Sequence, residues 1–139
     1  MEMILQVGVK IFLKNPEGKY LLLKRSPLKY PGIVNAWDIV GGRIEPGTGL
    51  LENLRREIFE ETKLEYNGTP SLVAAQDIFR SDKHVVRLTY AGEISGQPVL
   101  DNDHTEFCWL GLDEIEKLEG VDEFVKALMP ILTAEERSK

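Results

Sequence analysis

Residues 41–64 read GGRIEPGTGLLENLRREIFEETKL, and this stretch decides how the rest of the chain is organised. Its two leading glycines predict a tight loop, and a helical pattern follows them. Glu57, Glu60 and Glu61 stand near the end of that helix, where at about 100° per residue they share an arc roughly 100° wide. Like charges at this spacing destabilise an exposed helix by about 0.2–0.5 kcal/mol per pair, so the pattern predicts a cation between them. Carboxylate oxygens are hard ligands, which favours Mg²⁺ or Mn²⁺.

The same residues resemble the sequence box of the Nudix hydrolases, which reads G-x5-E-x7-R-E-U-x-E-E-x-G-U with U a bulky aliphatic residue. Aligned on its first glycine, the chain matches the box at Gly42, Arg56, Glu57, Ile58, Glu60, Glu61 and Leu64. It departs at Thr48, where the box has Glu, and at Lys63, where the box has Gly. Lys63 either takes the left-handed conformation of that glycine, at a cost of about 1 kcal/mol, or lets the helix run on to Asn67. The long spacing makes the match specific, and the chain is identified by this resemblance as a Nudix protein.

The resemblance implies a metal site built on this helix. Its expected ligands are the carbonyl oxygen of Gly41 and the carboxylates of Glu57, Glu60 and Glu61. Arg56 is expected to orient Glu57 through a charge-assisted hydrogen bond. The competing interpretation is an ordinary charged helix face, which the segment REIFEET alone would favour. The glycine-rich residues 41–47 at matching offsets upstream weigh against it.

Further candidate residues lie in two predicted loops. The acidic loop DNDHTE at 101–106 precedes the last predicted strand, where Nudix proteins usually add one more acid. The resemblance implies Asp103 there as a distal metal ligand or as the general base, with Glu106 as the second candidate. Glu57 is the first candidate for the base, and the alternative that the loop acids only cap a turn stays open. Arg25 is a candidate substrate contact, although basic loop residues are more often simply solvated.

Hydrophobic periodicity predicts an α/β fold. Strands are expected at 4–13, 19–24, 37–40, 71–79, 85–94 and 107–110, and helices after Thr48 and at 112–118 and 121–132. Thr48 is the expected N-cap of the first helix, and Leu50, Leu51, Leu54 and Ile58 are its expected buried stripe. This order suits a mixed sheet with helices on both sides, which agrees with the Nudix-like α/β/α sandwich and central mixed sheet that the resemblance implies.

Composition limits the remaining choices. At 139 residues and 42% hydrophobic, the chain predicts a single domain over 1–139, with a frayed polar tail at 133–139. The net charge of −6 argues against a nucleic-acid-binding surface. Cys108 is the single cysteine, which excludes an internal disulfide, fits a reducing cytoplasm and is expected to be an ordinary strand residue. The apolar start contains charges and predicts neither a signal peptide nor a membrane span. His84 and His104 are expected in loops.

These patterns together predict a Nudix-type hydrolase. The expected reaction is Mg²⁺- or Mn²⁺-dependent hydrolysis of a phosphoanhydride in a nucleoside diphosphate-linked compound, with (d)NTPs as the default substrates. A nucleotide-binding sensor of the same fold is the alternative, supported by Thr48 and Lys63. Isomerisation of an isoprenyl diphosphate is weaker, because that chemistry uses a positioned cysteine and Cys108 lies on the strand leading to Trp109. The expected partner is a small nucleotide, and a homodimer is left open.

Overall fold

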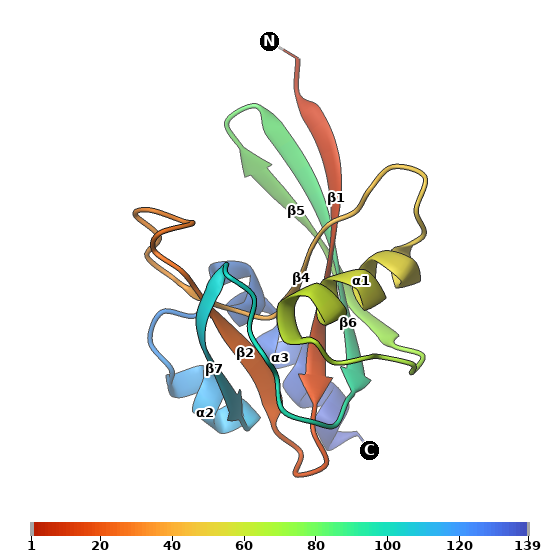
Figure 1. The fold of residues 1–139 in the computed structure, drawn as a ribbon, viewed down its shortest axis with the longest axis vertical. Coiled ribbons are helices and arrows are strands. Elements are labelled where there is room, and N and C mark those ends of the chain that lie inside the picture. The colour runs from red at the N-terminus through yellow and green to blue at the C-terminus, as the bar shows by residue number, and fades with distance from the viewer. Residues whose placement is uncertain (1, 139) are drawn as a thin grey trace.

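Strand β1 (Ile4–Lys14) is the axis of a seven-stranded mixed sheet (Figure 1). The structure is a computed structural model and describes residues 2–138. The other strands are β2 (Tyr20–Arg25), β3 (Trp37–Asp38), β4 (Val40–Arg43), β5 (Ser71–Arg80), β6 (Lys83–Glu93) and β7 (His104–Leu110). The helices are α1 (Leu50–Thr62), α2 (Leu112–Lys117) and α3 (Glu123–Arg137). None of the described helices is both long and apolar enough to cross a membrane.

The sheet opens beside β1. One edge of β1 pairs in parallel with β6 along its whole length, from Ile4 opposite Lys83 to Lys14 opposite Glu93. The other edge pairs with β4 along Gly8 to Ile11 and with β2 only at Lys14. The strand order is β3-β2-β1-β6-β5, with β7 attached to β2. The strands β4 and β2 therefore diverge from each other, and the site described below lies at this divergence.

Two hydrophobic clusters pack on opposite faces of the sheet. Alternation along β1 sends Val9, Ile11 and Leu13 to the α1 side and Phe12 to the α3 side. The first cluster contains Leu54 and Ile58 of α1, and the second contains buried residues of α2 and α3. Figure 1 shows α1 in front of the sheet and α3 behind it. The predicted α/β sandwich with a central mixed sheet is confirmed.

The entry into α1 differs from the prediction. Thr48 does not cap the helix: the N-cap is Gly49, without a side-chain bond. Instead Asn53, in the second turn, accepts from the amide of Glu45 at 3.0 Å and donates to the carbonyls of Thr48 at 3.0 Å and Gly49 at 2.6 Å. This buried amide fastens the loop before α1 to the helix.

The apolar stripe of α1 is narrower than predicted. Leu50 and Leu51 are each 38% exposed, so only Leu54 and Ile58 of the expected stripe are buried. The buried part of the apolar stripe therefore begins at Leu54.

Several element boundaries also differ. Gly41 and Gly42 lie within β4 rather than in a loop, paired with Lys10 and Val9. Helix α3 runs to Arg137, so residues 133–137 are helical rather than a frayed tail, while Lys139 lies outside the described residues. His84 and His104 lie in strands β6 and β7, not in loops, because both strands begin earlier than their apolar patterns do.

Lys63 is expected either to take a left-handed conformation or to let the helix continue to Asn67, and the C-terminal end of α1 distinguishes the two. The helix ends at Thr62, and Lys63 takes the left-handed conformation with φ of 62°. Its amide donates to the carbonyl of Phe59 at 2.8 Å. The lysine therefore adopts the conformation that the box glycine favours, and the helix does not run on to Asn67.

Candidate functional site

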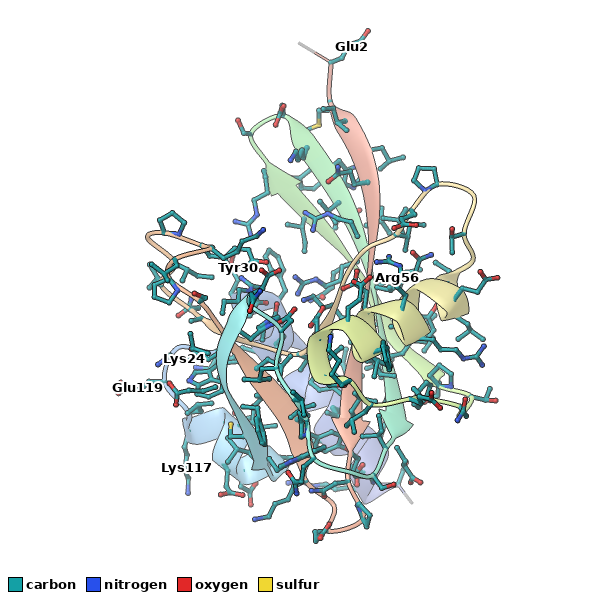
Figure 2. All side chains as sticks on the ribbon, viewed as in Figure 1. Glu2, Lys24, Tyr30, Arg56, Lys117 and Glu119 are labelled. Atoms are coloured by element: carbon teal, nitrogen blue, oxygen red, sulfur yellow. The ribbon has the colours of Figure 1, made fainter. Side chains whose placement is uncertain are left out.

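A cavity of about 470 Å³ lies where β4 and β2 diverge. Its walls come from β1, β4, α1, β6, the end of β2 and the segment leading into β7. Of the residues predicted as site residues, Gly41, Glu57, Glu60, Glu61, Asp103 and Arg25 all line it. In Figure 2, Tyr30 in the loop after β2 and Arg56 on α1 mark two sides of this region. The fold thus brings together residues that are up to 78 positions apart, from Arg25 to Asp103.

The two glycines of β4 allow α1 to approach the sheet. A Cβ added at Gly42 would lie 2.8 Å from a carboxylate oxygen of Glu57, closer than real contacts allow. A Cβ at Gly41, where φ is 144°, would lie 2.0 Å from the carbonyl oxygen of Val9. Gly41 therefore requires glycine, because a Cβ would meet the backbone of β1, whereas a Cβ at Gly42 would displace the Glu57 carboxylate.

Glu61 is a buried carboxyl next to a second one. It is 6% exposed, and a hydrogen bond joins it to Glu57. Burial and this bond raise the pKa of Glu61 to about 10, although the charge of Lys10 acts in the opposite direction. Without a cation, Glu61 therefore keeps its proton at neutral pH and shares it with Glu57.

The donor set fits a divalent ion. Two adjoining carboxylates and the carbonyl of Gly41 are hard oxygen ligands, and a cation between them would replace the shared proton. Glu60, 54% exposed at its side chain, stands at the open edge of the same cavity. Within residues 2–138, no three His, Cys, Asp or Glu side chains already have the spacing of a metal centre. Ion binding would therefore require these side chains to converge.

Arg56 contacts the carboxylate that it was predicted to orient. Its Nη1 donates to Glu57 at 3.1 Å and lies 3.4 Å from Glu60. Its Nη2 donates to Asn53 Oδ1 at 2.9 Å. The guanidinium is fixed from two sides and lies outside the cavity lining, which suits positioning rather than substrate contact.

The structure separates the two acidic candidates of the 101–106 loop. Asp103 lines the cavity, and its carboxylate is 3.9 Å from Lys29. Glu106 points elsewhere: it is 60% exposed at its side chain and pairs with Lys24 at 3.4 Å. His104 lines the cavity too and bonds Asp101 at 2.7 Å, a contact the sequence did not reveal.

Arg25 lines the cavity as part of a buried ion network. Its guanidinium pairs with Asp38 and, at 3.5 Å, with Asp122. Lys10 approaches Asp38 at 2.8 Å and Arg87 approaches Asp122 at 3.2 Å. Although burial alone would raise the pKa of Asp38, the Lys10 and Arg25 charges hold it well below its usual range. This network could not be predicted from the sequence, because its members lie on β1, β2, β3 and β6 and at the N-cap of α3.

Three arginines also border the cavity and were missed from the sequence: Arg43, Arg80 and Arg87. Burial and the charges of Arg87, Arg80 and Arg25 lower the pKa of Arg43. Their strands gave no signal, because a charged residue on a strand normally predicts a solvated face. The cavity therefore has an acidic side on α1 and a basic side on the sheet.

Cys108 is placed as an ordinary strand residue. It lies in β7, half-buried, and burial raises the pKa of its thiol to about 11, with Glu106 and Glu114 adding to the shift. A protonated thiol is a poor nucleophile, which weighs against the isomerase interpretation.

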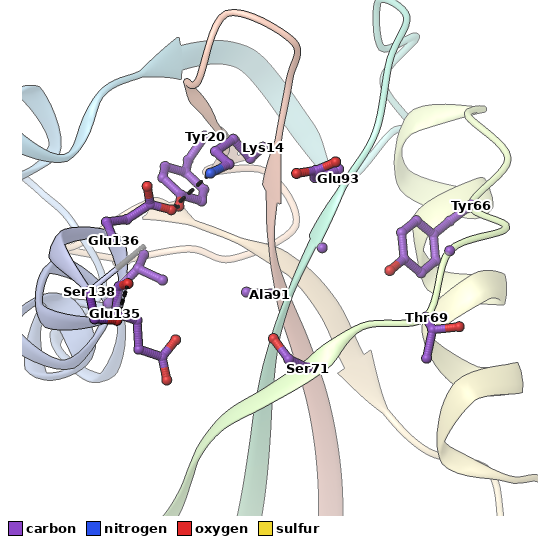
Figure 3. A pocket seen from close by; sticks show the side chains of 13 residues that line it. Lys14, Tyr20, Tyr66, Thr69, Ser71, Ala91, Glu93, Glu135, Glu136 and Ser138 are labelled. Atoms are coloured by element: carbon purple, nitrogen blue, oxygen red, sulfur yellow. Dashed lines mark hydrogen bonds and ion pairs between the residues drawn. The ribbon is translucent and has the colours of Figure 1, made fainter.

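A second cavity of about 610 Å³ holds none of the predicted site residues (Figure 3). It lies between α3, the end of β6 and the segment before β5, and its labelled side chains include Tyr20, Tyr66 and Glu136. The hydroxyl of Tyr20 donates to Glu136, so this polar pair is already satisfied. The larger cavity therefore carries no chemistry that the sequence points to.

Comparison with known proteins agrees with this geometry. The model of the NUDIX domain family matches residues 4–130. A Bacillus subtilis (strain 168) protein named "Putative 8-oxo-dGTP diphosphatase" is 32% identical over 101 residues, which cover 70% of this chain and 60% of that protein. The chain thus spans less than two thirds of the relative's length.

Solved structures share the whole fold. The MutT protein of Methanosarcina mazei Go1 superposes with a TM-score of 0.84 at 25% identity, covering 98% of both chains. The E. coli ORF135 protein superposes with a TM-score of 0.80 at 20% identity, covering 99% of this chain and 94% of the other. The glycine-backed glutamates, the sandwich fold and the family match agree, and the chain belongs to the NUDIX domain family.

Proposed function

We propose that the cavity beside α1 hydrolyses a phosphoanhydride bond in a nucleoside diphosphate-linked compound, with nucleoside triphosphates as the preferred class. The observation that supports this most is the buried Glu61 sharing a hydrogen bond with Glu57 directly against Gly42. Burying two adjoining carboxyls is unfavourable unless something positive occupies the space between them. A bound Mg²⁺ or Mn²⁺ would supply the positive charge that offsets the burial of the two carboxyls.

The proposed roles follow from position. Gly41, Glu57, Glu60 and Glu61 would hold the ion, with Asp103 contributing from the opposite wall. When bound, the ion would neutralise the diphosphate and activate water. Glu57 is proposed to take a proton from the attacking water. The water oxygen bonds to phosphorus as the bridging P–O bond breaks. Arg56 positions Glu57 for this, and Asp103 is the second candidate for the base.

The substrate class follows from two facts. The cavity combines carboxylates with arginines, which suits a metal-bound polyphosphate. The Bacillus relative is named for 8-oxo-dGTP, so oxidised and ordinary purine triphosphates are the first compounds to test.

A panel of nucleotides with Mg²⁺ or Mn²⁺, monitored by release of pyrophosphate or phosphate, tests the proposal. Glu57→Gln and Glu60→Gln should each lower kcat by at least about a hundredfold, as expected for loss of a metal ligand or base. Glu52→Gln, the same change in the exposed first turn of α1, is the matched control and should keep full activity. Near-wild-type rates in both site variants would refute the assignment. Tight nucleotide binding without release under either ion would favour the sensor instead.

A further inference from the structure

The basic side of the cavity is built as one face of the sheet. Arg43 on β4, Gly8 on β1 and Arg87 on β6 stand side by side in register. Arg80 of β5 lies on the same face, because it pairs with Lys83 and alternation keeps positions 83, 85 and 87 on one side. Three arginines from three strands thus border one part of the cavity.

Among the described residues, Arg87 is the one of these three arginines with an acidic partner. Arg87 is paired with Asp122 at 3.2 Å. In the part of the chain that the structure describes, no carboxylate forms an ion pair with Arg43 or Arg80. Arg43 donates from Nε to Gln6 at 3.1 Å, and the guanidinium of Arg80 lies 5.7 Å from the ring centre of Phe124. In a chain with a net charge of −6, unpaired arginines beside a cavity are unexpected unless an anion binds there.

The space and the support for an anion are also present. Gly8 has no side chain between Arg43 and Arg87, and a Cβ there would lie 3.8 Å from the Cδ of Arg43, so the Arg43 side chain extends over this glycine. The ring of Phe124, in the first turn of α3, lies under both Arg80 and Arg87, at 5.7 Å and 5.4 Å. A shared aromatic platform holds two guanidiniums in place without neutralising them.

We propose that Arg43 and Arg80, with Arg87 behind them, bind the terminal phosphate of a nucleoside triphosphate. This inference rests on the proposed function, in which the acidic side of the cavity holds the ion and the scissile diphosphate. Planar guanidiniums match phosphate oxygens and give paired hydrogen bonds. The basic face would then select triphosphates over diphosphates and hold the leaving pyrophosphate.

Kinetics on matched substrates test the selectivity. Arg43→Gln and Arg80→Gln should each raise KM for a nucleoside triphosphate by about tenfold, the size of one charge-assisted contact. For the corresponding diphosphate, KM should change less than about twofold, because that substrate lacks the third phosphate. Arg55 is an exposed arginine of α1 outside the cavity. Arg55→Gln removes the same charge and should leave KM unchanged for both substrates. An equal rise in KM for both substrates, or the same rise in the Arg55→Gln variant, would overturn the proposal.

Binding and stability give a second readout that does not need turnover. Calorimetry with pyrophosphate and Mg²⁺ should show about tenfold weaker binding for each arginine variant and unchanged binding for Arg55→Gln. Neither variant should lower the melting temperature, since each removes a positive charge from a group of like charges. Weaker binding accompanied by unfolding would indicate a structural role and overturn the proposal.

The two proposals fail in different ways. A protein that hydrolyses no nucleotide but binds pyrophosphate through Arg43 and Arg80 would refute the hydrolase assignment and leave the anion site standing. A protein that hydrolyses triphosphates and diphosphates alike, unaffected by either arginine change, would refute the anion site alone.

Discussion

At the scale of single residues, the site depends on a carboxyl group that is buried and on a glycine that makes room for a second carboxylate. Glu61 is buried beside Glu57 with its pKa raised to about 10, and Gly42 leaves room for the Glu57 carboxylate. Neither feature stabilises the metal-free fold. Such residues are expected where function, rather than stability, selected the arrangement.

The raised pKa of Glu61 makes the metal-free protein sensitive to alkali. The folded state keeps this proton up to about pH 10, whereas the unfolded chain releases it near its ordinary pKa of 4.5. The buried carboxyl therefore does not destabilise the fold below about pH 4.5, and its cost to the free energy of unfolding grows as pH rises toward 10. In EDTA, the free energy of unfolding should fall by up to about 1.4 kcal/mol per pH unit from this group.

Denaturant titrations between pH 5.5 and 8 measure this slope. Glu61→Gln cannot ionise, so it should flatten the profile and be more stable than wild type at pH 8, while losing the stabilisation that Mg²⁺ adds. Parallel profiles for the two proteins would contradict the assignment of the buried proton to Glu61.

Gly42→Ala tests the contact between β4 and α1. Its Cβ would press on the Glu57 carboxylate at 2.8 Å, so turnover should drop by at least about tenfold as that group is displaced. Gly49→Ala is the control, because nothing lies within 4 Å of a Cβ there. Steady-state kinetics of the two variants should differ sharply, and equal activity would show that the carboxylate has free room to move.

At the scale of elements, α1 ends on a residue in an unfavourable conformation. Lys63 has φ of 62°, which costs a residue with a Cβ about 1 kcal/mol. The helix stops there because the amide of Lys63 closes onto Phe59. The left-handed turn matters more to the fold than the identity of the residue in it.

Lys63→Gly should therefore stabilise the protein by about 1 kcal/mol, less the small loss of its bond to the Glu60 carbonyl. Lys126→Gly, placed inside α3, should instead destabilise by about 1 kcal/mol, since glycine is a poor residue in a helix interior. Thermal melts should show a higher melting temperature for Lys63→Gly and a lower one for Lys126→Gly. A destabilised Lys63→Gly would mean that the lysine side chain contributes more than its backbone costs.

At the scale of the whole molecule, a buried ion network joins the two sides of the open sheet. Asp38 is 1% exposed and holds Lys10 and Arg25, while Asp122 caps α3 and holds Arg87. These contacts connect β1, β2, β3, β6 and α3 around the cavity. Removing these ion pairs should therefore lower the free energy of unfolding of the whole domain.

Asp38→Asn should lower the free energy of unfolding by about 3–5 kcal/mol, because it leaves Lys10 and Arg25 facing a neutral partner in a buried place. Asp77→Asn, at a 65% exposed side chain beside His84, is the control and should change stability by less than about 0.5 kcal/mol. Urea titrations compare them. A loss below 1 kcal/mol for Asp38→Asn would show that solvent reaches the network.

The sequence predicted the parts that depend on local patterns. The mixed sheet and the helix that carries the box follow from spacing and resemblance, while the roles of the box residues and of Asp103 stay predictions. It could not predict the ion network or the arginine face, because their members meet only through strand register. It placed the cap at Thr48 because an isolated hydroxyl before a helix is the usual signal, whereas the N-cap is Gly49 and Asn53 fastens the preceding loop by donating to the carbonyls of Thr48 and Gly49.

The long parallel pairing of β1 with β6 has a consequence for how the chain is made. The central strand leaves the ribosome well before its partner at residues 83–93, because β2 to β5 and α1 are synthesised between them. Contacts between such distant segments form slowly, and the edge of β1 that pairs with β6 stays unpaired meanwhile. A nascent chain released before Glu93 would expose its most hydrophobic segment, and chaperone capture or aggregation is the expected fate of such fragments.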